Sequence, residues 1–144
     1  MRSLLVLLFI VTASAGIGSA QKPSTTETGP IRASGAYAEV LLRRTELQAD
    51  IEAFLGDYTE ENTKVIDARF ELGILIKDLD RIYTVRPSET AKLSTALGKL
   101  IVRRAALETD LARLMRSYNK DHPEVKRARR RVEIFAAAIK EILG

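Results

Sequence analysis

The chain has 144 residues, of which 46% are hydrophobic and 29% are charged, a composition typical of folded or coiled-coil proteins and not of disordered ones. The absence of cysteine excludes disulfides, thiolate metal sites, a cysteine nucleophile and a bacterial lipoprotein anchor. The net charge of +4 is small, and much of it comes from one cluster near the C-terminus.

The first twenty residues have the layout of a signal peptide. Arg2 is followed by the unbroken apolar run LLVLLFIV and then by small residues. We therefore predict a signal peptide over 1–20, cleaved after Ala20 or after Ala15, and a periplasmic or secreted protein. The alternative is retention as an inner-membrane anchor, because the uncharged segment is just long enough to span a bilayer.

Residues 21–35 are polar and rich in Ser, Thr, Gly and Pro, without apolar periodicity. This composition predicts a flexible linker.

An internal repeat follows the linker, since residues sixty positions apart coincide without a gap. The coincidences include Arg43/Arg103, Arg44/Arg104, Tyr58/Tyr118, Ala68/Ala128 and Arg69/Arg129. In both copies apolar residues alternate three and four apart, the spacing of helices that pack knobs into holes. We predict an all-α fold of two tandem antiparallel helical hairpins with coiled-coil-like packing, repeat 1 over 36–86 and repeat 2 over 87–144. The four helices are expected near 36–58, 62–84, 89–118 and 122–143.

Capping residues mark the expected helix starts. Asn62 is a good N-cap for the second helix, Ser88 for the third, and Pro123 suits the first turn of the fourth. The connections are short, so neighbouring helices should run antiparallel.

Arg44 and Arg104 occupy core-facing positions of the apolar ladder, once in each repeat. A buried charge needs a partner. Antiparallel pairing places Arg44 opposite the segment 78–80, which contains two aspartates. We predict that these arginines set the register of the helices or extend their charged ends to solvent.

The strongest charge cluster lies in the fourth helix. No aromatic residues interleave for base stacking, and export argues against nucleic acid. An anionic polysaccharide, lipid headgroups or an acidic protein would fit, and the alternative is a solvated helix face. The possible anion-binding residues are Lys126, Arg127, Arg129, Arg130 and Arg131.

A second apolar stripe follows the second helix through Ile66, Phe70 and Ile74. In the fourth helix the first two of these positions are Lys126 and Arg130, so repeat 1 has an extra apolar face. We expect this face to cover the other hairpin or to contact a protein partner.

Catalytic and cofactor-binding patterns are missing from the sequence. The single histidine, His122, lies beside Asp121 and Pro123 at a helix start, where a capping role fits better than metal binding. We therefore predict no catalytic, cofactor-binding or metal-binding residues, and a protein that is not an enzyme.

The turn from Tyr118 to Val125, with His122-Pro123 between them, resembles the Tyr-x3-His-Pro-x-Val element of polysaccharide co-polymerases, the chain-length determinant family. The earlier turn keeps the tyrosine and the valine but has Asn62-Thr63 in place of His-Pro. The resemblance implies a periplasmic coiled-coil hairpin near envelope polysaccharide machinery. The membrane helices that flank this region in the family are not seen in the sequence.

Together these features predict an exported, non-enzymatic coiled-coil protein that acts by binding another protein or by forming a homo-oligomer. The alternative is an accessory factor in envelope or exopolysaccharide assembly, which would bind an anionic polymer through the basic cluster at residues 126–131.

Overall fold

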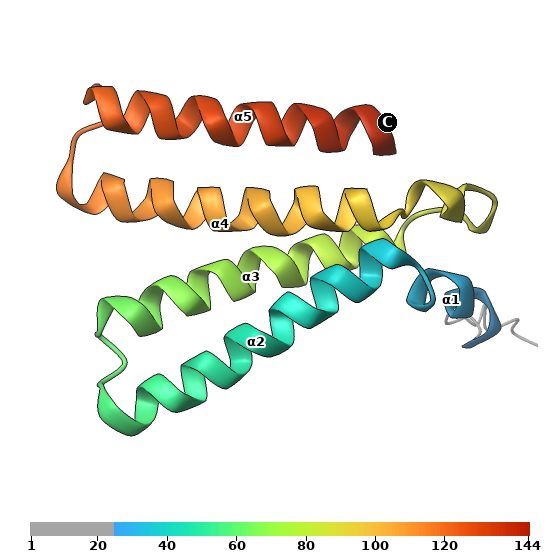
Figure 1. Ribbon diagram of the computed structural model, residues 1–144, viewed down its shortest axis with the longest axis horizontal. Coiled ribbons are helices and arrows are strands. Elements are labelled where there is room, and N and C mark those ends of the chain that lie inside the picture. The colour runs from blue at the N-terminus through green and yellow to red at the C-terminus, as the bar shows by residue number, and fades with distance from the viewer. Residues whose placement is uncertain (1–24) are drawn as a thin grey trace, which may run out of the picture.

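The computed structural model describes residues 25–144, and this part of the chain contains helices and no strand (Figure 1). The elements are α1 (Thr25–Arg32), α2 (Gly35–Asp57), α3 (Thr63–Tyr83), the 3-10 helix η1 (Pro87–Lys92), α4 (Thr95–Ser117) and α5 (Pro123–Leu143). The prediction of an all-α fold is confirmed. The predicted signal peptide and the first part of the predicted linker lie outside the described residues.

None of the helices between residues 25 and 144 combines the length and the apolar character needed to cross a membrane.

The helix bounds recur at the interval of the sequence repeat. The bounds of α4 follow those of α2 by sixty residues, and those of α5 follow those of α3 by the same number. The N-caps recur as well: Ser34 Oγ accepts a hydrogen bond from the N–H of Tyr37, and Ser94 Oγ accepts one from that of Leu97. Similar residues at equivalent positions therefore start and stop both helix pairs.

The helices pack in a fixed order around one core. α2 packs along α3, α4 packs against both of them, and α5 packs along α4. In Figure 1, α5 and α2 form the two opposite edges of the molecule, with α3 and α4 between them. Val40, Leu75, Ile82 and Leu97 are fully buried in this core. Burial of each such side chain contributes about 1.5–3 kcal/mol, so the apolar ladder joins the two helix pairs.

α2 and α4 approach most closely near their N-termini. A Cβ atom added to Gly98 of α4 would lie 2.7 Å from the Cβ of Glu39 and 2.9 Å from the Cα of Ala36, both in α2. Because real Cβ atoms do not approach other atoms so closely, the crossing requires glycine at this position.

The prediction of a flexible linker over 21–35 was wrong for its C-terminal part, which contains α1. Composition indicated a tether, but Ile31 is only 3% exposed and belongs to the core. The hydroxyl of Ser34 donates a hydrogen bond to the carbonyl of Ile31 at 2.6 Å and its oxygen caps α2. One buried apolar side chain and one cap fix a segment that is otherwise polar.

The predicted start of the third helix at residue 89 was also wrong. Residues 87–92 form η1, and α4 begins at Thr95 with Ser94, not Ser88, as its N-cap. The intervening Leu93 is buried, and its carbonyl accepts a hydrogen bond from the N–H of Ala36 at 3.1 Å. Burial of Leu93 bends the chain between the 3-10 helix and α4. The other helix ends agree with the sequence to within one residue.

Candidate interaction surfaces

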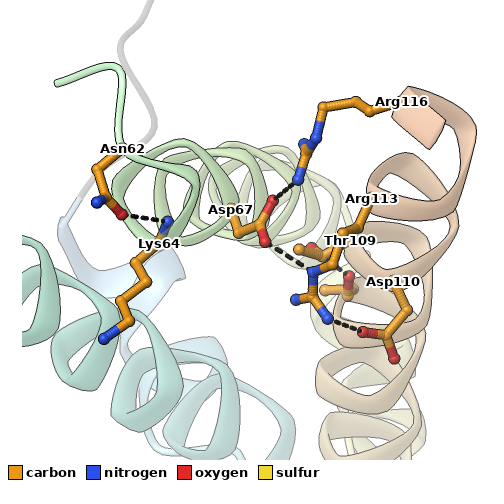
Figure 2. A network of polar contacts seen from close by, with 8 residues as sticks. Asn62, Lys64, Asp67, Thr109, Asp110, Arg113 and Arg116 are labelled. Atoms are coloured by element: carbon orange, nitrogen blue, oxygen red, sulfur yellow. Dashed lines mark hydrogen bonds and ion pairs between the residues drawn. The ribbon is translucent and has the colours of Figure 1, made fainter.

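The two helix pairs are joined by ion pairs centred on Asp67 of α3 (Figure 2). Its carboxylate accepts a hydrogen bond from Arg113 at 2.8 Å and another from Arg116 at 2.5 Å, both from α4. Burial alone would raise the pKa of Asp67, but the hydrogen bonds from Arg116 and Arg113 outweigh it and lower the pKa below its usual value. The same contact raises the pKa of Arg113.

A second inter-pair contact is more deeply buried. Arg104 of α4 donates hydrogen bonds from one nitrogen to both carboxylate oxygens of Asp78 at 2.6 Å, and both side chains are almost inaccessible to solvent. Charges in such an environment are costly unless they are paired, so this contact fixes where α4 lies on α3.

The ion pair that the sequence makes available to Arg44 in the segment 78–80 does not form. Asp78 is occupied by its repeat counterpart, Arg104, and the buried Nε of Arg44 has no hydrogen-bond partner. The ion pair between α2 and α3 is made by the neighbouring arginine instead: Arg43 donates to Glu71 at 2.8 Å, which raises the pKa of Arg43. Arg43 and Arg44 point about 100° apart on α2, and the apolar spacing does not determine which of two adjacent arginines reaches α3.

The five residues of the predicted basic cluster are all exposed, but they do not form one patch. Three of them have acidic neighbours, in the pairs Lys126–Asp121, Arg127–Glu124 and Arg130–Glu133. Successive residues of an α-helix point about 100° apart, so basic residues at five of the six positions 126–131 face several directions. The cluster predicted from the sequence is therefore divided around α5.

Two of these arginines border a groove of about 360 Å³ between α4 and α5, which we call the α4–α5 groove. Leu107 and Leu114 of α4 and Ala128 of α5 supply its apolar lining. Its charged lining consists of three arginines and two acids, and the acids pair with two of the arginines, in Arg113–Asp110 and Arg127–Glu124. The third arginine, Arg131, has no ion-pair partner within the described part of the chain. The groove therefore combines apolar lining with a small excess of positive charge, which suits an amphipathic segment that carries a negative charge.

The predicted apolar stripe on α3, formed by Ile66, Phe70 and Ile74 and called the α3 stripe below, is only partly covered. Ile66 is 39% exposed and Phe70 is 45% exposed, whereas Ile74 packs against the core. α4 contacts the neighbouring side of α3, through Asp67 and Asp78. The second helix pair therefore does not cover the outer two residues of the stripe.

The turns after α2 and α4 share one backbone geometry. Asn62 Oδ1 accepts a hydrogen bond from the N–H of Lys64 at 2.9 Å, and His122 Nδ1 accepts one from that of Glu124 at 3.2 Å. The predicted capping role of His122 is thus present in the structure, and its ring stacks on Tyr118 with centroids 4.1 Å apart.

The four residues that resemble the co-polymerase element all have a role in this turn. Tyr118 stacks on His122, His122 caps α5, Pro123 occupies the first helical position and Val125 is fully buried. Construction of the turn therefore accounts for these residue types without a contact to polysaccharide.

The ion pairs of Arg113 and Arg116 with α3 could not be predicted from the repeat, because the counterparts of these arginines are the small residues Ala53 and Gly56. Among residues 25–144 no three His, Asp or Glu side chains are grouped so that they could hold a metal ion.

Comparisons with protein-family models, with curated proteins and with solved structures give no match to this chain.

Proposed function

We propose that this chain is an exported, non-enzymatic protein made of two tandem antiparallel helical hairpins, and that it acts by binding another protein or a second copy of itself. The observation that carries the proposal is the exposed part of the α3 stripe. Large apolar side chains at neighbouring positions of a helix, left uncovered by the rest of the fold, are typical of protein-interaction surfaces.

The distribution of basic residues favours protein binding over binding of an anionic polymer. A polymer with repeated negative charge is held best by a continuous positive surface. Here Lys126, Arg127 and Arg130 have acidic neighbours. Lys126 and Arg130 share one face of α5, and Arg127 and Arg131 lie on the next. Binding of the purified protein to anionic polysaccharide, or to vesicles with anionic lipid headgroups, would therefore contradict the preference for a protein partner.

Phe70→Asp tests the proposal, with Ile76→Asp as a matched control. Ile76 is 47% exposed, as much as Phe70, but it lies on another side of α3.

The partner is identified first by cross-linking. A photoreactive phenylalanine analogue is introduced at position 70 or 76 in the exporting cell, and the adducts that form on irradiation are analysed. We expect a discrete protein adduct from position 70 and none from position 76.

The unmodified protein and both aspartate variants would then be compared for binding to that partner or for self-association by light scattering. Loss of binding in Phe70→Asp alone supports the proposal. No adduct at position 70, together with unchanged mass in all three proteins, contradicts it. Sequencing the N-terminus of the accumulated protein tests export separately, and an intact N-terminus in the cytoplasm would contradict it.

A further inference from the structure

The contact between the two helix pairs has two sides: the groove of the first pair, and the face of α4 that docks in it. Because the chain repeats, the molecular surface presents an equivalent of each. α4 lies against α2 and α3, with Gly98 against Ala36 and with Arg113 and Arg104 on Asp67 and Asp78. Because the helix bounds repeat after sixty residues, α4 and α5 present an equivalent groove, and α2 presents an equivalent docking face. Among the described residues no helix packs along either surface in the way that α4 packs on α2 and α3; the short α1 makes only a few contacts with α2.

The groove half is the α4–α5 groove. Its Arg127 and Arg131 occupy the repeat positions of Asp67 and Glu71, which in the first pair carry the ion pairs to α4 and α2. Ile134, the counterpart of Ile74, is 54% exposed, whereas Ile74 packs against the core. The second groove is thus built at the positions of the first, but it is open, and it carries arginines in place of acids at these two positions, beside the acids Asp110 and Glu124.

The docking half lies on the outer side of α2. On α4, the residues buried toward the first pair include Ala105 and Thr109, and their counterparts on α2 are Thr45 and Ala49. Both of these are exposed, as is Glu52, one helical turn further along the same face. These side chains are small enough for close approach, and Glu52 supplies a negative charge where the groove has arginines.

Charge is segregated between the two halves of the chain. Residues 35–84 contain eleven acidic and six basic residues, a net charge of −5, and residues 95–144 contain six acidic and twelve basic residues, a net charge of +6. The contact inside the molecule already pairs acidic α3 with basic α4. A contact between the first half of one copy and the second half of another would have the same favourable sign.

We propose that α2 of one copy docks in the α4–α5 groove of a second copy, with Glu52 beside Arg127 and Arg131. This contact is related to the packing of α4 on α2 and α3 but is not identical to it, because α2 has Ala38 where α4 has the Gly98 that its close crossing requires. The two surfaces differ, so the contact is heterologous, and a pair of copies keeps one free groove and one free α2 face. Copies therefore add head to tail, into a chain or a closed ring. The inference rests on the proposal that the protein works by binding protein, but it uses a different surface from the α3 stripe.

Sedimentation and light scattering of the protein, purified in the form that the cell accumulates, test the contact. We expect the average mass to rise with protein concentration and to fall when the salt concentration is raised from about 50 to about 500 mM, because salt screens the charges across the groove. The double variant Arg127→Glu, Arg131→Glu should raise the dissociation constant at least about a hundredfold, since it places like charges opposite Glu52.

The double variant Lys126→Glu, Arg130→Glu is the matched control. It changes the net charge by the same amount, at the same spacing on the same helix, but neither residue lines the α4–α5 groove. We expect its dissociation constant to stay within about threefold of the unmodified protein, because these charges lie at the rim of the contact or outside it. Circular dichroism of both variants shows whether the helices are retained.

A charge exchange gives the sharpest result. Glu52→Arg should weaken self-association, and an equimolar mixture of Glu52→Arg with Arg127→Glu, Arg131→Glu should restore it, because each contact in the mixed assembly then joins opposite charges. A change that only perturbs folding would not be rescued by mixing.

Two results would overturn the inference: a monomer at every concentration and salt, or association that the groove variant and its control weaken equally. If Phe70→Asp abolishes association and the groove variant does not, the proposed function stands and the head-to-tail contact is wrong. If position 70 gives no adduct while the groove variant alone prevents association, the α3 stripe is wrong and the head-to-tail contact stands.

Discussion

α3 and α5 occupy equivalent places in the repeat but have different surroundings. α3 packs against both α2 and α4, and seven of its residues are buried, among them Glu71 and Asp78. α5 packs along α4 at the edge of the molecule, and only Val125 and Ile139 are buried (Figure 1). The same ladder of apolar positions thus produces an inner helix and an outer one.

The charges of the two helices follow this difference. α3 carries acids where it meets arginines of α2 and α4, and α5 carries arginines at two of the same positions. Repetition determines where helices begin and end, because caps and turns are local. Position in the fold determines which charged contacts each helix makes with its neighbours.

The largest expected difference between the helices concerns the buried charge of α3. Asp78→Ala should reduce the free energy of unfolding by about 3–5 kcal/mol, because Arg104 would stay buried without its partner. The double variant Asp78→Leu, Arg104→Leu should be clearly less destabilised than Asp78→Ala, because no unpaired charge is left. Urea unfolding of both proteins provides the measurement, and equal losses would show that the pair is not the cause.

Ile82 and Ile142 allow the same substitution at equivalent positions of the two helices. Ile82 is fully buried, whereas Ile142 is half-buried. We expect Ile82→Ala to cost about 2–4 kcal/mol and Ile142→Ala about 1 kcal/mol, because a cavity forms only where neighbours enclose the side chain on all sides. Midpoints of urea unfolding compare the two variants, and similar shifts would contradict an inner and an outer role.

Much of the fold could be predicted because it depends on local signals. Asn62 and Pro123 marked helix starts correctly, since a cap acts on the N–H groups of its own helix. The apolar periodicity also predicts one buried face on each helix, and Val65 and Val125, at equivalent positions of the two copies, are fully buried.

The errors arose where tertiary contacts decide. Burial of Ile31 and Leu93 depends on residues far away in the chain, so composition could not distinguish α1 from a tether or η1 from the start of α4. The pairing of Asp78 with Arg104 could not be predicted, because α3 meets α4 as well as α2, and a single sequence does not show which helix of the next pair packs on α3. The α4–α5 groove was missed for the same reason.

Asp67 should make the contact between the helix pairs sensitive to acid. Its folded pKa is lowered, so its stabilising contribution is complete above the unfolded value of about 3.9 and is lost as the pH falls through the lower folded pKa. We expect Asp67→Asn to cost about 1–2 kcal/mol at pH 7, because two charge-assisted hydrogen bonds are weakened. The counterpart variant Arg127→Gln on α5 should cost less than about 0.5 kcal/mol, because its ion pair is exposed.

Unfolding measured at several pH values separates these cases. The stability difference between the unmodified protein and Asp67→Asn should be constant from neutral pH down to about pH 5 and should shrink below about pH 4. A difference that does not change with pH would show that the loss comes from packing and not from the carboxylate charge.

The smallest expected effect compares the two caps. Asn62→Ala should cost about 1 kcal/mol, because the N–H of Lys64 loses a well-formed hydrogen bond of 2.9 Å. His122→Ala removes a longer cap bond of 3.2 Å but also the stacking on Tyr118, which is worth about 0.5–1.5 kcal/mol where aromatic pairs are buried and less at an exposed turn.

Urea unfolding of both variants provides the measurement. If His122→Ala costs nothing, neither the cap bond nor the stacking of His122 stabilises the second turn, which is then held by Pro123 and the burial of Val125.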